Sequence, residues 1–320
     1  MEKLKKSKSK LIILLLVVLL FTGCTKQLKN KDNKPVTNPV TGQVLTENIL
    51  CQPTDQNTKK LYEENGVDVN TLPKCDNFGI SQLKNYDGLW STIFVKTLAW
   101  LVLKVGSIVK SYGLALIIVS LAIRLATFPL TKKTAMQSEL IKEAQPELKR
   151  LEKKYEGKDD QDSMMKKSQE MAAIYKKYHI NPVTGCLFAL IQIPIFIAFL
   201  EAINRVPAIF EEKFLIWELG ATPLVGFQNG VVSIICYLVL TILVGVTTFF
   251  SLKLNSTNNP GNEQAEQMNK IMFFMILFMS IFMTSALNIY WIVTNLFTVV
   301  QNILVKRTKD KENNKRKKVK

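Results

Sequence analysis

Long apolar runs alternate with lysine-rich stretches along the chain. A helix needs roughly 20 apolar residues to cross about 30 Å of hydrocarbon, and five runs meet or approach that length. They predict transmembrane helices over residues 112–130, 185–203, 230–252, 271–287 and 288–305. Polar Ser285, Asn288 and Tyr290 lie near the junction of the last two runs and indicate a tight turn there. We therefore expect an all-α polytopic membrane protein with five transmembrane helices.

The first residues have the layout of an export signal. Residues 1–23 combine a basic start with a short apolar core, and Thr22-Gly23 precedes Cys24. This segment resembles bacterial lipoprotein signals, which implies cleavage before Cys24 and a diacylglyceryl group on its sulfur. An uncleaved signal-anchor is the alternative, and both place the following segment outside the cytoplasm.

Residues 24–87 are polar and have no periodic apolar stripe, so they predict an extracytoplasmic polar tether. Cys51 and Cys75 lie within it, on the oxidising side of the membrane. A disulfide between them and a pair of free thiols are both compatible with the sequence.

Residues 88–107 are apolar but are interrupted by Lys96 and Lys104, which lie near one face of a helix. Trp90 and Trp100 are residue types that favour the membrane interface. This pattern predicts an amphipathic helix that lies on the outer leaflet.

Positive charge sets the orientation of the predicted spans. The chain carries 42 Lys and Arg against 26 Asp and Glu, a net charge of +16. Residues 132–180 hold twelve of the basic residues and residues 306–320 hold nine, whereas the loop 204–228 holds only Arg205 and Lys213. The positive-inside rule therefore places 132–180 and the C-terminal tail in the cytoplasm and 204–228 outside.

The two basic segments differ in pattern. In 132–180 apolar residues recur at helical spacing on both sides of Glu156-Gly157, which predicts two antiparallel amphipathic helices, a cytoplasmic hairpin. The tail 306–320 has no apolar period, and such charge runs are usually disordered. The tail could bind anionic lipids or ribosomal RNA through phosphates, or only fix the topology.

Arg124 is a permanent charge inside the first predicted span, and no acidic residue lies at its depth in the other spans. It could extend to the cytoplasmic interface or line a hydrated hollow. Polar residues in several spans favour the hollow. They are Ser120, Gln192, Thr241, Thr247, Thr248, Trp291, Thr294, Asn295 and Thr298.

Most enzyme classes are excluded by motif. The chain has no glycine-rich phosphate loop, no H-E-x-x-H and no G-x-S-x-G, and its one histidine, His179, lies in a lysine-rich stretch. The spans contain no histidine or aspartate for an intramembrane protease. We therefore expect no catalytic residue, no cofactor, no metal and no DNA partner.

Three segments carry a resemblance to a known family. They are SYGLALIIVSLAIRLATFPLTKKTAMQS (111–138), GCLFALIQIPIFIAFLEAI (185–203) and ALNIYWIVTNLFTVVQNILVKR (286–307). Together they resemble the YidC/Oxa/Alb family of membrane protein insertases, in the lipoprotein-type form of single-membrane bacteria. The resemblance covers about residues 83–310.

The resemblance implies a hydrophilic groove that opens to the cytoplasm and lipid. Arg124 matches the family's groove arginine, Gln192 the polar residue of its second span and Trp291 an aromatic residue of its last span. The implied function is to integrate and help fold membrane proteins, and lipoproteins among them, alone or with the Sec translocon. The implied partners are nascent membrane proteins and, through the tail, the ribosome. A small transporter or channel is the alternative function.

Overall fold

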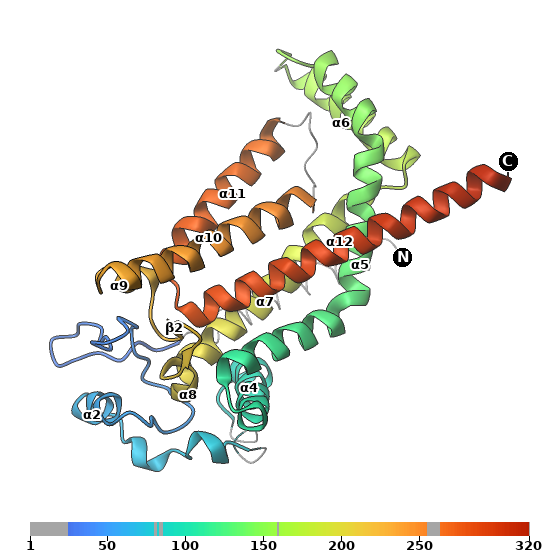
Figure 1. Cartoon of the computed structure of the whole chain (residues 1–320). Helices are drawn as coiled ribbons and strands as arrows, with labels where there is room; N and C mark the ends of the chain where they lie inside the picture. Colours follow the sequence, from blue (N-terminus) through green and yellow to red (C-terminus); the bar gives the residue numbers. More distant parts are fainter. Residues whose placement is uncertain (1–24, 80–81, 83–85, 159, 255–262, 320) are drawn as a thin grey trace. The chain divides into compact units, whose positions relative to one another are not determined.

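We describe a computed structural model of the chain (Figure 1). It describes every residue except 1–24, 80–81, 83–85, 159, 255–262 and 320. For residues 182–191, 263–266, 268 and 312–319 it describes the backbone only. The predicted signal peptide and Cys24 therefore lie outside the described residues. Nearly all regular structure in the described part is helical, with one two-stranded hairpin, and the chain divides into two compact units.

The first unit consists of Met1–Val119, Ile193–Leu240 and Phe282–Ile289. The second unit consists of Ser120–Gln192, Thr241–Ile281 and Tyr290–Lys320. The elements in chain order are α2 (Gln56–Glu64), η1 (Val69–Thr71), η2 (Cys75–Asn77), η3 (Ser91–Val95), α4 (Lys96–Val109), α5 (Tyr112–Lys154), α6 (Gln161–Lys177), α7 (Pro182–Arg205), α8 (Pro207–Phe210), β1 (Lys213–Phe214), β2 (Trp217–Glu218), α9 (Pro223–Gly226), α10 (Val231–Leu254), α11 (Glu263–Phe282) and α12 (Ser285–Val319).

Several helices are long and apolar enough to cross a bilayer. Within the described residues there are four, Ser91–Val109, Tyr112–Lys154, Val231–Leu254 and Ser285–Lys311, and a shorter apolar helix covers Asn269–Phe282. The chain is therefore a multi-pass membrane protein, as the sequence predicts. Residues 88–107 were predicted to form a helix that lies on the outer leaflet. The helix Ser91–Val109 is also long enough to cross the bilayer, so its placement on the leaflet stays a prediction.

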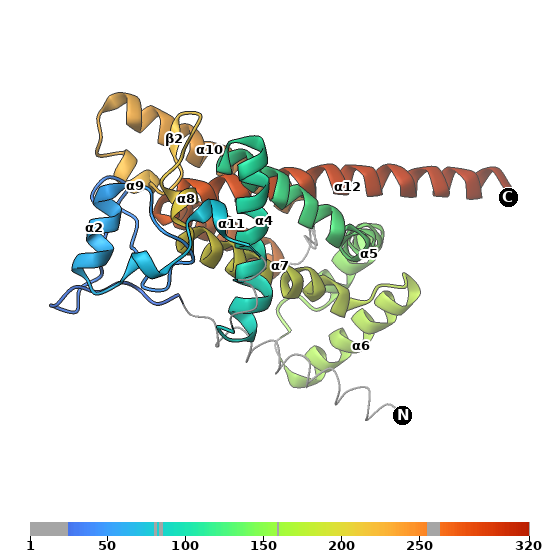
Figure 2. The same ribbon diagram turned by 90° about the horizontal axis from the view of Figure 1, so that it is seen from below.

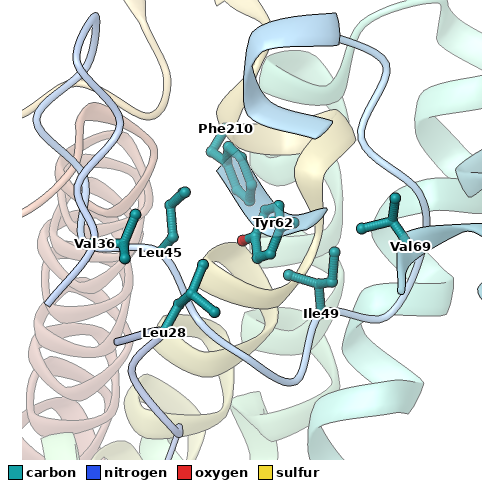
Figure 3. Close-up of a cluster of buried hydrophobic side chains, with 7 residues drawn as sticks. All are labelled: Leu28, Val36, Leu45, Ile49, Tyr62, Val69 and Phe210. Carbon is teal, nitrogen blue, oxygen red and sulfur yellow. The ribbon is translucent and has the colours of Figure 1, made fainter. Parts of the chain in front are cut away.

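The predicted tether is wrong for residues 27–78, which fold around a hydrophobic core (Figure 3). Leu28, Val36 and Leu45 meet through backbone hydrogen bonds between short extended segments, and Tyr62 of α2 and Phe210 of α8 complete the cluster. The apolar residues of this core are spaced irregularly along the chain, so the sequence shows no helical or strand period. Burial of these scattered side chains nevertheless removes apolar surface from water, which stabilises the segment.

A disulfide joins Cys51 and Cys75, whose Cα atoms lie 4.9 Å apart. It closes a loop of 24 residues in sequence separation. Of the two states that the sequence left open, the structure contains the bonded one.

The first predicted span, residues 112–130, is part of a longer helix. α5 continues from Tyr112 to Lys154 and contains both Pro129 and Pro146. Proline costs a backbone hydrogen bond, yet spanning helices tolerate it where neighbours compensate. Figure 1 shows that the ribbon of α5 changes direction along its length.

The last helix also departs from expectation. The predicted tight turn between the last two runs is present, but it lies slightly earlier than expected. Only Met283 and Thr284 separate α11, which ends at Phe282, from α12, so Ser285, Asn288 and Tyr290 form the first turns of α12. The predicted disordered tail is wrong, because α12 continues as an unbroken helix to Val319 (Figure 2). A helix that has already nucleated propagates at little cost, so the polar tail extends it without an apolar stripe of its own.

The hairpin of the second unit is formed by the later part of α5 and by α6. Ala144, Leu148 and Ile180 form its buried core, with Met171 and Tyr175 packed on it. Ion pairs join Lys177 to Glu147 and Lys154 to Glu170, each at 2.5 Å. From the first pair to the second, the residue on α5 moves toward the C-terminus and the residue on α6 moves toward the N-terminus. The two helices are therefore antiparallel, as the sequence predicts.

Trp90, which the sequence suggested for the membrane interface, is buried within the protein. It is 2% exposed, and its indole Nε1 donates to Glu201 Oε1 at 2.9 Å. Beside it the buried guanidinium of Arg205 donates to the Asn48 carbonyl (2.7 Å), to Ser91 Oγ (2.6 Å) and to Asp87 Oδ2 (2.8 Å). This network ties the first residues of the predicted interfacial helix to α7 within the first unit.

Candidate functional site

Arg124 lies on α5 and is enclosed by protein, with only 8% of its surface exposed. It interacts electrostatically with Tyr290 of α12. Ser120, one turn earlier on α5, is also buried. This burial favours an inward-facing Arg124 over one that extends along the outside of its helix to the interface.

Tyr290 connects the arginine to the second predicted site residue. Gln192 Nε2 of α7 donates to the Tyr290 hydroxyl at 3.2 Å, and Tyr290 is 1% exposed. Arg124, Gln192 and Tyr290 thus bring α5, α7 and α12 together around buried polar groups. Sequence reasoning assigned Tyr290 to a turn and missed this role.

A pattern in the sequence could have revealed Tyr290. Tyr290, Thr294, Thr298 and Gln301 follow one another at spacings of four, four and three residues, so they share one face of a helix. All four are buried in the structure. A polar stripe of this kind in an apolar helix marks the side that faces the protein.

Trp291 and Asn295 belong to a second cluster. Trp291 Nε1 and Asn295 Nδ2 both donate to Thr248 Oγ1 of α10, at 3.1 and 2.9 Å. Thr248, which the sequence named among the polar residues of the third span, is therefore the acceptor that joins α10 to α12. Thr294 has a more local role, because its hydroxyl donates to the Trp291 carbonyl of its own helix at 3.0 Å.

Polar contacts continue from this site along α5 and α12. Thr131 Oγ1 donates to Gln301 Oε1 at 3.1 Å, and further on Lys309 pairs with Glu143 at 2.9 Å. A cavity of about 330 Å³ opens near the basic end of these helices. It is lined by Glu139, Lys142, Leu254, Asn302, Ile303, Lys306, Arg307 and Asp310. Polar contacts between α5 and α12 therefore recur from the level of Arg124 to the end of the second unit that carries the basic hairpin and tail.

The chemistry that this arrangement offers is hydrogen bonding and one buried positive charge. Among the described residues, no group of three or more His, Cys, Asp or Glu is placed to hold a metal ion. The site is suited to hydrating and attracting polar groups inside an otherwise apolar bundle, and none of its contacts resembles an activated nucleophile with its base.

Comparison with known proteins identifies the family of the chain. A sequence model of the family described as 60Kd inner membrane protein matches residues 104–313. The membrane protein insertase YidC of Oceanobacillus iheyensis is 36% identical over 244 residues, which cover 74% of this chain and 91% of that protein. The membrane protein insertase MisCA of Bacillus subtilis is 37% identical over 226 residues, which cover 70% of this chain and 82% of that protein.

A solved structure, described as an active YidC insertase with its first transmembrane domain resolved, is also similar. It shares 21% identity and a TM-score of 0.45, over 67% of this chain and 46% of that chain. This likeness is too low to carry the assignment, which rests on the sequence matches. Because the family model covers more than half of the chain and both relatives match over most of their length, the chain belongs to the 60Kd inner membrane protein family, whose members include the YidC insertases.

Proposed function

We propose that this chain is a membrane protein insertase that integrates nascent membrane proteins and helps them fold. The observation that carries the proposal is the polar cluster of buried Arg124 and Tyr290 with half-buried Gln192, in a multi-pass protein whose relatives are named insertases. The transporter or channel alternative gains no support from those relatives.

The cluster suits a polar passenger that crosses only part of the bilayer. A short hydrophilic segment of the substrate would reach Arg124 along the polar contacts of α5 and α12, and the positive charge would attract its acidic side chains. The apolar helix of the substrate would pass into lipid at the same time. Burial of its apolar surface, at about 25 cal/mol per Å², could drive the step without a nucleotide.

The surroundings of the cluster extend this proposal. The hairpin of α5 and α6 would receive substrate in the cytoplasm, and the basic end of α12 would contact the ribosome or anionic lipids. The protein would work alone or beside the Sec translocon. The unequal distribution of Lys and Arg supports a cytoplasmic hairpin and C-terminus, and the lipobox-like start supports a lipid anchor at Cys24 on the outer face.

Site-specific photocrosslinking tests the function directly. A photoreactive residue would replace Gln192 or Trp291 while a single-span protein with an acidic N-terminal tail is being synthesised. We expect crosslinks to the nascent chain at both positions, lost when synthesis stops. A probe at Ile108, an exposed apolar residue of α4, serves as the control. Crosslinks at Ile108 alone would show that Gln192 and Trp291 do not contact the substrate and only pack helices together.

The charge of Arg124 is tested separately. Arg124→Lys keeps the positive charge and should retain much of the insertion activity, whereas Arg124→Ala should lose it for substrates with acidic translocated tails. Insertion is measured by protease protection of the tail in intact cells. Normal insertion by Arg124→Ala of such substrates would contradict the electrostatic account, and a matched substrate with a neutral tail shows whether the variant is folded.

A further inference from the structure

The hairpin β1–β2 ends in an apolar tip that its own fold does not require. Lys213 pairs with Glu218 and Phe214 with Trp217, which leaves Leu215 and Ile216 as the two-residue turn. Leu215 is 73% exposed and Ile216 52% exposed. Tight hairpin turns favour Gly, Asn or Asp, above all where φ is positive, and Leu215 has a φ of 55°. Two large aliphatic side chains at this place therefore serve neither the turn nor a core.

The hairpin is graded in polarity from base to tip. An ion pair between Lys213 Nζ and Glu218 Oε1 (3.7 Å) lies at the exposed base. The aromatic residues Phe214 and Trp217 follow, and the aliphatic tip comes last. Charged, aromatic and aliphatic layers in this order match the change from lipid headgroups to acyl chains. The few residues concerned extend by roughly 3.3 Å each, which fits the roughly 5–10 Å to which interfacial elements penetrate.

Contacts within the first unit fix the hairpin beside the ends of two candidate spans. The Phe214 ring packs on Gly113, the second residue of α5, so closely that an added Cβ would lie 2.3 Å from its Cγ. Trp217 Nε1 donates to the Cys236 carbonyl of α10 at 2.9 Å. Gly113 and Cys236 both lie within two turns of the start of their helices. The hairpin is thus held at the level where α5 and α10 would enter the bilayer.

The neighbouring surface of α10 is also apolar and exposed. Val231, Val232 and Ile235 point away from the protein in the first turns of this candidate span. If α10 spans the bilayer, lipid covers these residues. The hairpin is bonded to α10 near the same residues, so its tip lies in the same lipid environment. Lipid therefore accounts for the tip and for α10 together, whereas a protein partner would have to cover both from within the bilayer.

We propose that the β1–β2 hairpin is a membrane anchor whose tip, Leu215 and Ile216, inserts among the phospholipid acyl chains of the leaflet in which α5 and α10 begin. The inserted tip would hold the starts of α5 and α10 at a set depth. This role does not depend on the insertase activity.

Fluorescence quenching in reconstituted vesicles tests the anchor. Leu215→Cys, in full-length protein with Cys186→Ala and Cys236→Ala, is labelled with a small environment-sensitive dye. Cys236 contributes only its backbone carbonyl to the Trp217 contact, so alanine preserves it. The vesicles contain phosphatidylcholine and phosphatidylglycerol, with or without a lipid that carries a spin label near the top of its acyl chain. Aqueous iodide is the second quencher.

Two positions calibrate the measurement. Val232→Cys reports an exposed residue on α10, and Lys60→Cys reports the polar surface of α2. We expect the Leu215 probe to follow Val232, with spin-labelled lipid quenching it several times more strongly than iodide does, and Lys60 to show the reverse. Ile216→Cys repeats the test if the first variant does not fold.

Two other results would overturn the proposal. Quenching of Leu215 by iodide to the extent seen at Lys60 would place the tip in water. Protection of Leu215 from both quenchers would show that protein covers the tip, as a partner or a second copy would.

Discussion

At the scale of single residues, the buried polar groups around Arg124 determine what the site can do. A buried arginine is costly unless its surroundings compensate, and here Tyr290 interacts with it and also accepts from Gln192. Thr294, one turn along α12, is also buried, but its hydroxyl donates to the Trp291 carbonyl of its own helix. The two positions form a matched pair, because one hydroxyl joins helices and the other does not.

Tyr290→Phe should therefore impair insertion more than Thr294→Val. The first change leaves the half-buried Gln192 Nε2 without its acceptor, and loss of a hydrogen bond typically costs about 0.5–1.5 kcal/mol. The second removes a hydroxyl whose bond is within one helix, so it should change insertion little. Both variants are compared by protease protection of an acidic-tailed substrate. Equal activity of the two would mean that the Gln192–Tyr290 contact is dispensable.

Glu211 makes the stability of the first unit depend on pH. Its Oε2 accepts from the Thr54 amide (2.8 Å), the Thr54 hydroxyl (2.5 Å) and the Asp55 amide (3.3 Å). Burial nevertheless raises the pKa of this carboxyl above its ordinary value of 4.5. The folded state then binds a proton more tightly than the unfolded state. Stability from this group is fully present below the unfolded pKa and is lost as pH rises through the folded pKa.

Glu211→Gln should remove this dependence, because glutamine keeps an acceptor oxygen and carries no charge. The wild type should lose stability relative to the variant as pH rises above the ordinary glutamate pKa of 4.5 and through the raised pKa of the folded state. Thermal unfolding of both proteins in detergent, followed through the exposure of residues 27–78 to protease, measures the difference. A constant difference across this range would show that Glu211 has an ordinary pKa.

At the scale of elements, the α5–α6 hairpin depends on a small core. Leu148 is buried between the two helices, while its neighbour Lys149 is exposed. The surface ion pairs of the hairpin are exposed and contribute little beyond orientation. Apolar packing is therefore the main interaction that keeps α6 on α5.

Leu148→Ala should loosen the hairpin, since removal of a buried leucine typically costs about 2–5 kcal/mol. Hydrogen exchange of the α6 amides should become faster by a large factor. Lys149→Ala, the control at the adjacent exposed position, should leave exchange unchanged. Slow exchange in Leu148→Ala would mean that other contacts hold α6.

At the scale of the whole molecule, the second unit contains the polar site, and the first unit contains a disulfide and the small hydrophobic core of residues 27–78. The core of residues 27–78 is small, and small cores commonly need a covalent constraint. The disulfide restricts the unfolded chain, and the model for a loop of this length predicts a contribution of about 3 kcal/mol.

Cys51→Ser with Cys75→Ser should therefore expose residues 27–78 to protease in intact membranes. Since the residues of the Arg124 cluster belong to the other unit, crosslinking at Gln192 should persist in the same variant. Unchanged protease resistance would show that apolar packing alone holds the first unit together. The single variant Cys236→Ser, which removes a free thiol, serves as the control.

The sequence by itself determined the membrane class, the positions of most long apolar helices, the distribution of basic residues and the identity of the unusual arginine. Hydropathy and charge are properties of consecutive residues, so the order of residues in the chain is enough to determine them. For the same reason Gln192, Trp291 and Asn295 stood out as polar residues in apolar runs. Their partners did not, because a partner on another helix leaves no local trace.

Only the tertiary structure decided that Gln192 bonds Tyr290, whereas Trp291 and Asn295 bond Thr248. It also decided that Thr294 bonds its own helix. It also decided that Cys51 meets Cys75 and that residues 27–78 have a core. That core joins single apolar residues from different turns, and α12 extends through a tail that has no stripe of its own. The physical reason is the same throughout: these features depend on contacts between residues far apart in the chain or on cooperativity along a helix, and neither produces a period in the sequence.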